Sequence, residues 1–278
     1  MIAVCITTYD HEAFIAQAIE SVLAQQCEEP LRIYIGDDAS TDGTRTVCER
    51  YAAEDERIVY VRRSENLGLV NNTIDLYRRI IADGCEYVAM LDGDDYWIKE
   101  DKLQLQLDYL KQHPEVGLVH TAAYDDVNGQ LVDADSPDKP IGDIRLSYNL
   151  IGASHTNCTV VFRMSLLREE DLKELEQQHF RVLDYPLYGI FSQDTQFGFL
   201  YVYTAVWRNH PSVSQPRNIK TFLTYKWHYA RAWRWLDKKY FGNFHFRFDK
   251  AILWYIRQFF YILFAQIKKK LYLCSRFR

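Results

Sequence analysis

The chain has 278 residues, of which 48% are hydrophobic, and it carries a formal net charge of −5. This length and composition exclude a disordered chain and allow one large domain, or one domain with an appendage. The six cysteines lie at least 21 positions apart, which excludes a C-x-x-C zinc or redox site and argues against a disulfide framework.

Apolar patterns predict alternating strands and helices over the first 112 residues. Residues 2–7 are an apolar run typical of a strand, and apolar residues recur with helical spacing from Ile15 to Leu23. The same reasoning predicts strands near 31–36, 58–61 and 87–91, and helices near 44–53, 69–82 and 101–112. Strands that alternate with helices form right-handed β-α-β units, so we expect a parallel sheet.

The pattern changes beyond residue 116. The stretch "VGLVHTAAY" is followed by Asn128-Gly129, a dipeptide that favours a two-residue hairpin, so antiparallel pairing is expected there. We further predict a strand at 158–163, a helix at about 165–178 and an aromatic strand in "FGFLYVYTAVW". The fold class is therefore α/β, with a mixed sheet flanked by helices.

The stretch "IGDDASTDGTRTVCE" poses a choice between a calcium loop and another kind of site. Its acids and Gly43 nearly satisfy the EF-hand spacing from Asp38 to Glu49. That motif needs a helix on each side, whereas "LRIYIGD" alternates as a strand does. We therefore expect a strand that ends in Asp37 and Asp38, followed by a turn and a helix.

A second strand also runs into acids. "YVAML" is followed by "DGDDYW", which places Asp92, Asp94 and Asp95 at a turn where Gly93 permits a tight bend. Ligands of open parallel sheets bind outside the carboxyl ends of the strands. Crowded carboxylates suit Mg²⁺ or Mn²⁺ together with phosphate oxygens, and the alternative is a set of solvated turn acids that cap helices.

Four stretches carry a resemblance to a known family. They are "VCITTYDHEAFIAQAIESVLAQ", "DDASTDGT", "ENLGLVNN" and "MLDGDDYW". In this order and spacing they resemble the family 2 inverting glycosyltransferases of the GT-A fold, over roughly residues 1–215 and most strongly up to Lys102. The resemblance implies a Rossmann-like nucleotide-binding catalytic domain at 1–215, followed by a helical, basic and aromatic extension at 216–278.

The resemblance also implies roles for residues that bind the donor. Thr7 and Tyr9 would line the nucleotide pocket, and Asp38 would accept a hydrogen bond from a pyrimidine ring, so calcium is not needed. For Thr7 the alternative is a strand-end hydroxyl that bonds the backbone. Asp92 would contact the ribose or the donor sugar, and Asp94 would bind Mn²⁺ or Mg²⁺ on the diphosphate.

Three residues near the end of the matching region complete the expected site. The family places an acid at a helix start as the general base, and "RVLDYPLYGIFS" offers Asp184, where many members have Glu-Asp and this chain has Leu183 before it. A lone Asp is also a common helix cap. In "AVWRNHPSVS" the resemblance implies His210 near the metal and Arg208 near the phosphates, a surface-loop histidine being the alternative.

The C-terminal extension differs from the rest of the chain in charge. Residues 217–278 hold fifteen Lys and Arg against two acids, a net of +13, and the remainder holds eighteen against thirty-six, a net of −18. Residues 251–267 are largely apolar and precede "KKKLYLCSRFR". We expect this segment to lie on an anionic membrane surface; the alternatives are a membrane span, or packing on the enzyme or on a second subunit in a homo-oligomer.

Together these features predict a metal-dependent inverting glycosyltransferase, with a UDP-sugar as the expected donor and a glycan or lipid-linked glycan of surface polysaccharide synthesis as acceptor. The processive Q-x-x-R-W signature is absent from the expected region, so we expect transfer of a single sugar. "MIAVCITTYD" does not read as a signal peptide, and the predicted location is the cytoplasmic face of the membrane. The acidic body argues against nucleic acid as a partner.

Two alternatives remain at this level. A sugar-phosphate nucleotidyltransferase would share a nucleotide fold and a metal, but it needs a glycine-rich basic loop, and "TTYDHEAF" has no glycine, Lys or Arg. A membrane-attached scaffold without catalysis is the second alternative. The intact Asp38, Asp92, Asp94 and Asp184 argue against it.

Overall fold

The computed structural model describes residues 1–127, 129–133, 157–208 and 219–241. The chain divides into two compact units, Met1–His210 and Pro211–Arg278. In chain order, the elements of the first unit are β1 (Ile2–Thr8), α1 (Ile15–Leu23), β2 (Leu31–Asp37), α2 (Thr44–Glu54), β3 (Ile58–Arg62), α3 (Leu69–Ala82), β4 (Tyr87–Asp92), β5 (Tyr96–Trp97), α4 (Lys102–Gln112), β6 (Val116–Val127), β7 (Gln130–Asp133), η1 (Asn157–Thr159), β8 (Val161–Arg163), η2 (Met164–Leu166), α6 (Glu169–Gln178), α7 (Asp184–Asp194) and β9 (Gln196–Arg208).

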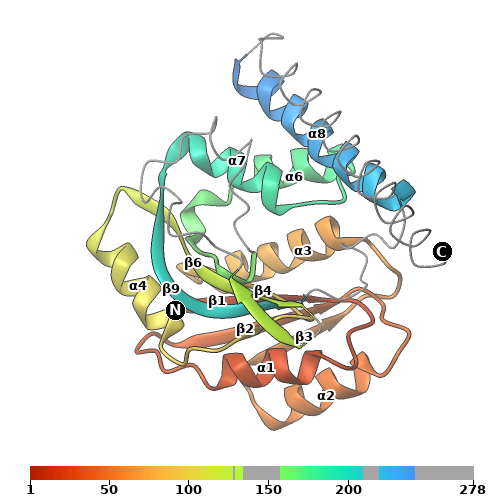
Figure 1. Cartoon of the computed structure of the whole chain (residues 1–278), viewed down its shortest axis with the longest axis vertical. Helices are drawn as coiled ribbons and strands as arrows, with labels where there is room; N and C mark the ends of the chain where they lie inside the picture. Colours follow the sequence, from red (N-terminus) through yellow and green to blue (C-terminus); the bar gives the residue numbers. More distant parts are fainter. Residues whose placement is uncertain (128, 134–156, 209–218, 242–278) are drawn as a thin grey trace, which may run out of the picture. The chain divides into compact units, whose positions relative to one another are not determined.

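The first unit is built on one mixed sheet (Figure 1). Its strand order is β3-β2-β1-β4-β8-β6-β9-β5, and β7 pairs with β6 beside this path. The four strands β3, β2, β1 and β4 are parallel, which confirms the predicted β-α-β units. The predicted hairpin is also confirmed, because β6 and β7 pair antiparallel and Val127 lies opposite Gln130.

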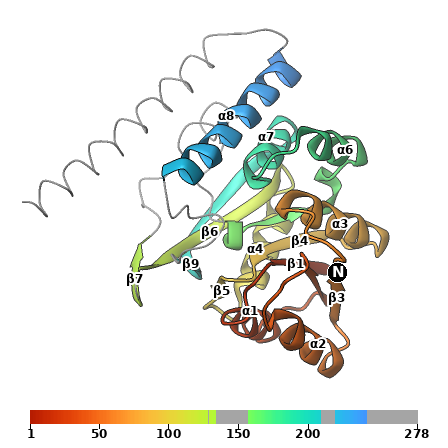
Figure 2. The same cartoon turned by 90° about the vertical axis from the view of Figure 1, so that its right-hand side faces the viewer.

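Helices cover both faces of the parallel strands, with α1 and α2 on one side and α3, α6 and α7 on the other (Figures 1 and 2). Alternate residues of β1 (Ile2, Val4 and Ile6) join the core on the α1 side, where α1 contributes its buried stripe. On the opposite face the rings of Tyr77 and Phe162 pack edge to face. This burial on both faces explains why the strands read as apolar runs in the sequence.

Three details differ from the sequence prediction. The two-residue strand β5 follows a tight turn and is too short to give a periodic signal. The strand expected at 158–163 covers only Val161–Arg163 and is preceded by the 3-10 helix η1. The helix expected from 165 begins at Glu169, where three acids in the first turn favour the positive end of the helix dipole.

The second unit contributes one described element, α8 (Ile219–Phe241). It provides the first part of the predicted helical extension, and the apolar segment 251–267 lies outside the described residues. None of the helices in the described part of the chain combines the length and apolar character that crossing a bilayer requires.

Candidate active site

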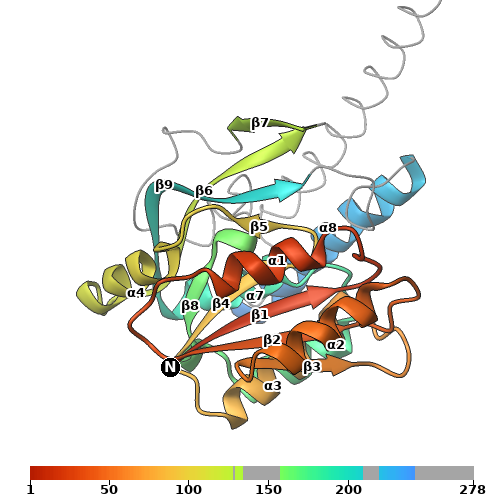
Figure 3. The same cartoon turned by 90° about the horizontal axis from the view of Figure 1, so that it is seen from below.

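The predicted donor residues meet at one edge of the sheet, where β1, β2 and β4 end together (Figure 3). In the strand register Thr7 lies beside Gly36 on one side and beside Asp92 on the other. Thr8 in turn lies beside Asp37. Residues that are 85 positions apart therefore become neighbours, because parallel strands bring their carboxyl ends to the same edge.

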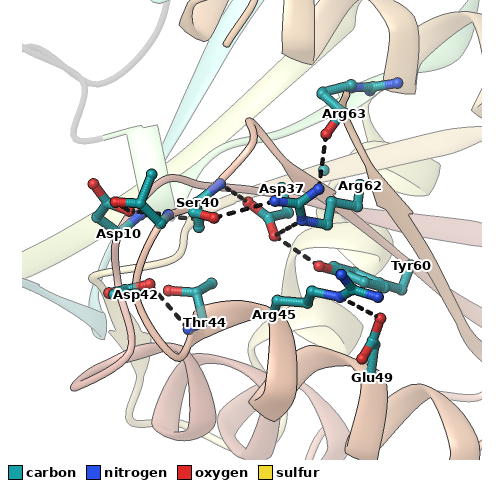
Figure 4. Close-up of polar contacts among 12 residues, drawn as sticks. Asp10, Asp37, Ser40, Asp42, Thr44, Arg45, Glu49, Tyr60, Arg62 and Arg63 are labelled. Carbon is teal, nitrogen blue, oxygen red and sulfur yellow. Dashed lines mark hydrogen bonds and ion pairs between the residues drawn. The ribbon is translucent and has the colours of Figure 1, made fainter. Parts of the chain in front are cut away.

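Asp37 holds the turn that follows β2 (Figure 4). Its fully buried carboxylate accepts a hydrogen bond from the Tyr60 hydroxyl at 2.6 Å and one from the Ser40 backbone N–H at 2.8 Å. The Arg62 Nε atom lies 3.8 Å from the same carboxylate. Asp37 is thus paired within the protein, as a buried charge must be, and it is not directed at a ligand.

Asp42 ties the same turn to the loop that follows β1. Its two oxygens accept the backbone N–H groups of Thr44 and Glu12, each at 3.0 Å. The Glu12 carboxylate in turn accepts the Gly43 N–H at 3.0 Å, and the Asp10 N–H donates to Ser40 Oγ at 3.0 Å. Asp42, one of the acids that suggested a calcium loop, therefore joins two loops, and the segment runs from a strand into a helix as predicted.

Asp38 directly follows β2, and its side chain is buried. Its oxygens accept the backbone N–H groups of Leu67 at 2.7 Å and of Gly68 at 2.9 Å. Burial raises the pKa of Asp38, and the two backbone hydrogen bonds oppose this shift. Asp10 and burial, and to a smaller extent the charge of Asp38, raise the pKa of Tyr9.

Asp92 receives hydrogen bonds from two side chains, Thr7 and Asn157, which the sequence did not reveal as a set. Thr7 Oγ1 donates to Asp92 Oδ1 at 3.1 Å, and Asn157 Nδ2 lies 3.3 Å from Oδ2. The Tyr188 hydroxyl donates to Asn157 Oδ1 at 2.7 Å, which fixes the orientation of the amide. Burial and Asp94 raise the pKa of Asp92 to about 7, against the effect of Asn157 and Thr7.

Asp94 and Asp95 follow in the same turn, close to the loop after β1. A Cβ atom on Gly93 would lie 2.8 Å from the Thr8 side chain, so the close approach requires glycine here. Asp94 Oδ2 lies 3.8 Å from His11 Nε2. His11 is a site residue that the sequence interpretation missed, although it lies within a motif that carried the family resemblance.

Asp95 and Arg208 connect the acidic turn to β9. The buried Asp95 carboxylate accepts the Arg208 backbone N–H at 2.9 Å, and burial together with Asp94 and Asp92 raises its pKa. The Arg208 guanidinium donates to the Asp94 carbonyl at 2.5 Å and to Gln17. Arg208 therefore lies beside the acidic turn, as the predicted phosphate contact must.

Asp184 is the first residue of α7, and the neighbouring N-cap position is occupied by Leu183. Burial raises the pKa of Asp184, and the backbone N–H of Tyr185 opposes the shift. The charge of Asp184 contributes to the raised pKa of Asp92. The predicted base thus interacts electrostatically with Asp92, one of the acids expected to contact the sugar donor. His210, the predicted metal ligand, lies outside the described residues.

The acids around Asp94 are the residues that would hold a divalent cation. Among the described residues, no three His, Cys, Asp or Glu side chains are grouped as a complete metal site. A cation on a diphosphate takes only one or two carboxylates, with phosphate oxygens and water as its other ligands. Burial, and then the charge of Asp94, raise the pKa values of Asp92 and Asp95, and the negative charge concentrated in this turn fits such a cation.

A comparison with protein families decides the classification. The model described as Glycosyl transferase family 2 matches residues 3–175, which is more than half of the chain. The chain belongs to this family. The family resemblance inferred from the four sequence stretches is therefore confirmed.

Two bacterial glycosyltransferases are among the relatives that the sequence matches. The putative teichuronic acid biosynthesis glycosyltransferase TuaG of Bacillus subtilis is 38% identical over 112 residues, which are 40% of this chain and 42% of TuaG. The dTDP-rhamnosyl transferase RfbG of Shigella flexneri is 30% identical over 105 residues, 37% of this chain and 36% of RfbG. The matches thus span less than half the length of these relatives.

Solved structures show the same fold. TarS 1-349 of S. aureus in complex with UDP-GlcNAc has a TM-score of 0.60 and 19% identity, over 83% of this chain and 66% of that one. The mannosyltransferase PcManGT of Pyrobaculum calidifontis, solved with GDP-Man and Mn²⁺, has a TM-score of 0.57 and 17% identity, over 88% and 65% of the two chains. The predicted α/β fold of GT-A type is confirmed.

Proposed function

We propose that this chain is an inverting glycosyltransferase of the hexosyltransferase type, which moves one sugar from a nucleotide-diphosphate sugar to an acceptor hydroxyl. The observation that carries the proposal is the meeting of Asp38, Asp92 and Asp94 at one sheet edge, with the charge of Asp184 contributing to the raised pKa of Asp92. Burial raises the pKa values of Asp38, Asp92 and Asp184, and acids with raised pKa values in one cluster are typical of catalytic sites.

The nucleotide would bind between the loops that follow β1 and β2, with Thr7 and Tyr9 lining the pocket. Each Asp38 oxygen accepts one backbone N–H and retains a second lone pair, so Asp38 can still accept the ring N–H of a pyrimidine. A UDP-sugar is the expected donor. Asp92, held by Thr7 and Asn157, would contact the ribose or the donor sugar.

Asp94 would hold the divalent cation, Mn²⁺ or Mg²⁺, with His210 as the second proposed ligand and His11 as a close neighbour. A cation bound there supplies a Lewis acid that stabilises negative charge on the diphosphate. Arg208 would add a phosphate contact, since its guanidinium already lies at the acidic turn.

Asp184 would act as the general base. The acceptor oxygen forms a bond to the anomeric carbon, on the face opposite the diphosphate, and its proton passes to the Asp184 carboxylate. The bond between the anomeric carbon and the diphosphate oxygen breaks, and its electron pair leaves with the nucleoside diphosphate. Burial raises the pKa of Asp184, which makes the carboxylate a stronger base for this transfer.

A glycan or a lipid-linked glycan of surface polysaccharide synthesis is the proposed acceptor class. TuaG, a relative, is named for teichuronic acid biosynthesis. Residues 217–278 hold fifteen Lys and Arg against two acids, and this net charge of +13 supports a peripheral position at the cytoplasmic face of an anionic membrane. A lipid-linked acceptor would be presented at that surface.

The test uses the purified full chain with Mn²⁺ and a panel of UDP-, GDP- and dTDP-sugars. We expect one donor to be consumed, with a product of inverted anomeric configuration by NMR. Asp94→Asn should abolish transfer and weaken donor binding, whereas Asp184→Asn should abolish transfer and leave donor binding intact. Glu54→Gln, an exposed acid on α2, is the matched control and should change neither.

Other outcomes would contradict the proposal. If no donor binds even with metal and lipid present, the chain is the inactive scaffold. If the chain instead consumes a nucleoside triphosphate and a sugar 1-phosphate, it is the nucleotidyltransferase. If the product retains the donor's anomeric configuration, the assignment of Asp184 as a general base in a direct displacement is wrong.

A further inference from the structure

The part of the mixed sheet formed by β5, β9, β6 and β7 carries a set of tyrosines on one face. The register places Tyr96 beside Val206, Val206 beside Tyr124, and Tyr124 beside Asp133, so these residues form one row across four strands. Residues directly opposite each other share a face. Figures 2 and 3 show β7, β6 and β9 side by side in this part of the first unit.

Two further tyrosines extend this row along β9. The rings of Tyr124 and Tyr203 stack with centroids 4.2 Å apart and an interplanar angle of 14°. Tyr201 packs edge to face against Tyr203, and their hydroxyl oxygens are 3.2 Å apart. Tyr201 is 47% exposed. We call Tyr96, Tyr124, Tyr201 and Tyr203 the tyrosine face.

The tyrosine face begins at the candidate active site. The Arg208 guanidinium lies 4.4 Å from the centre of the Tyr96 ring and also donates to the Asp94 carbonyl. From Arg208 the strand leads back to Tyr201 over seven residues, or roughly 20 Å at the usual rise of a strand. This distance matches several sugar rings laid end to end.

We propose that the tyrosine face binds the acceptor glycan, with the sugars that precede the reacting hydroxyl lying along β9. This inference rests on the proposed function and names where its acceptor binds. Sugar rings present C–H faces that pack on aromatic rings and hydroxyl groups that need polar partners. Tyrosine meets both needs, because it combines a large apolar ring with a hydroxyl.

The charges around the tyrosine face favour a neutral glycan over a membrane surface. Asp133 lies beside Tyr124 in the strand register, at the β7 end of the row. Asp126 lies beside Arg208 of β9 and beside Leu131 of β7 in the same register. Carboxylates accept hydrogen bonds from sugar hydroxyls, whereas they repel anionic headgroups. The Tyr203 hydroxyl forms a hydrogen bond with Tyr201. This bond, burial and the charge of Asp133 raise the pKa of Tyr203. The hydroxyl supplies a further polar contact at the edge of the tyrosine face.

The test measures binding of neutral oligosaccharides to the full chain by saturation-transfer NMR and titration calorimetry. The probes are gluco-, manno-, galacto- and N-acetylglucosamine oligomers of graded length. We expect one series to bind with an affinity that rises with chain length. Tyr201→Ala should weaken that binding about tenfold, which corresponds to the loss of ~1.4 kcal/mol of stacking.

Three controls keep the result specific. Tyr201→Phe retains the ring and should bind nearly as well as the unchanged chain. Val132→Ala removes an equally exposed apolar side chain from β7, where Val132 pairs with Asp125 on the opposite face, and should change nothing. Tyr203→Ala should weaken glycan binding as Tyr201→Ala does, with the affinity for the donor identified above unchanged.

The outcomes separate this inference from the proposed function. If the donor binds and is hydrolysed but no oligosaccharide binds, or Tyr201→Ala binds glycan as well as the unchanged chain, the tyrosine face is not the acceptor site and the proposed function stands. If Tyr201→Ala instead reduces binding to phosphatidylglycerol vesicles and leaves glycan binding intact, this face contacts membrane and the inference is wrong. If the unchanged chain binds none of the sugar-nucleotide donors, the proposed function itself is refuted.

Discussion

Lys102 provides a test of how the core supports the acidic turn. It begins α4 with its side chain fully buried, where Nζ donates to Gln106 at 2.6 Å and lies 4.3 Å from the centre of the Trp97 ring. Burial lowers the pKa of Lys102 from 10.5 to about 7. We predict that Lys102→Met changes the pH dependence of stability.

The sign and size follow from proton linkage. Between pH 7 and 10.5 the folded amine is largely neutral and the unfolded amine is protonated, so the unfolded state binds more protons and stability rises with pH. Each pH unit is worth up to about 1.4 kcal/mol. Between pH 7 and pH 9 the free energy of unfolding of the unchanged chain should therefore rise by about 2 kcal/mol relative to Lys102→Met.

The assay is urea unfolding followed by tryptophan fluorescence at pH 7, 8 and 9. The comparison of slopes is independent of the contacts that Lys102→Met removes, because these are lost equally at each pH. Lys111→Met on the same helix is the control, since Glu29 raises the pKa of Lys111 and leaves it protonated throughout this range. Identical pH dependence in the unchanged chain and Lys102→Met would show that the buried amine is charged, and would refute the reasoning.

Three other perturbations test the site. Asn157→Ala removes the amide that lies between Tyr188 and Asp92. Loss of a hydrogen bond to a charged group costs about 1.5–3 kcal/mol, so kcat/KM should fall at least about tenfold. Unchanged steady-state kinetics would contradict this prediction. Asp94→Glu should raise the Mn²⁺ concentration for half-maximal activity about tenfold or more in a metal titration, because the longer side chain would place its carboxylate wrongly for the proposed cation. An unchanged titration would show that Asp94 is not a metal ligand. Gly68→Ala places a Cβ at φ 80° and should lower stability by about 1–2 kcal/mol in thermal unfolding, whereas an unchanged Tm would show that the loop relaxes.

Local patterns account for what the sequence predicted well. The strands and helices up to α4 alternate as short apolar runs and helical stripes, and both patterns are visible within a few residues. The acids at the ends of β2 and β4 were found for the same reason, because a strand end and its acid are adjacent in the chain. Asp38 and Asp94 could thus be assigned to one edge before any distance was known.

Contacts that depend on strand order could not be predicted in this way. Asn157 reaches Asp92 because β8 inserts beside β4, and no local signal marks that insertion. Tyr188 meets Asn157 only through the placement of α7. The tyrosine face depends on register shifts between β6 and β9, which a repeating pattern cannot reveal.

The hydrogen bonds that link the loops after β1 and β2 have a consequence for how the proposed donor would bind. Backbone N–H groups of Asp10 and Glu12 bond to side chains of the turn after β2, and the Gly43 N–H bonds back to Glu12. Neither loop can swing away without breaking the bonds that hold the other, so they should open as a single cooperative unit in hydrogen exchange. The conformational entropy of both loops is lost during folding, and the nucleotide that we propose to bind between them would meet a site whose shape is already set.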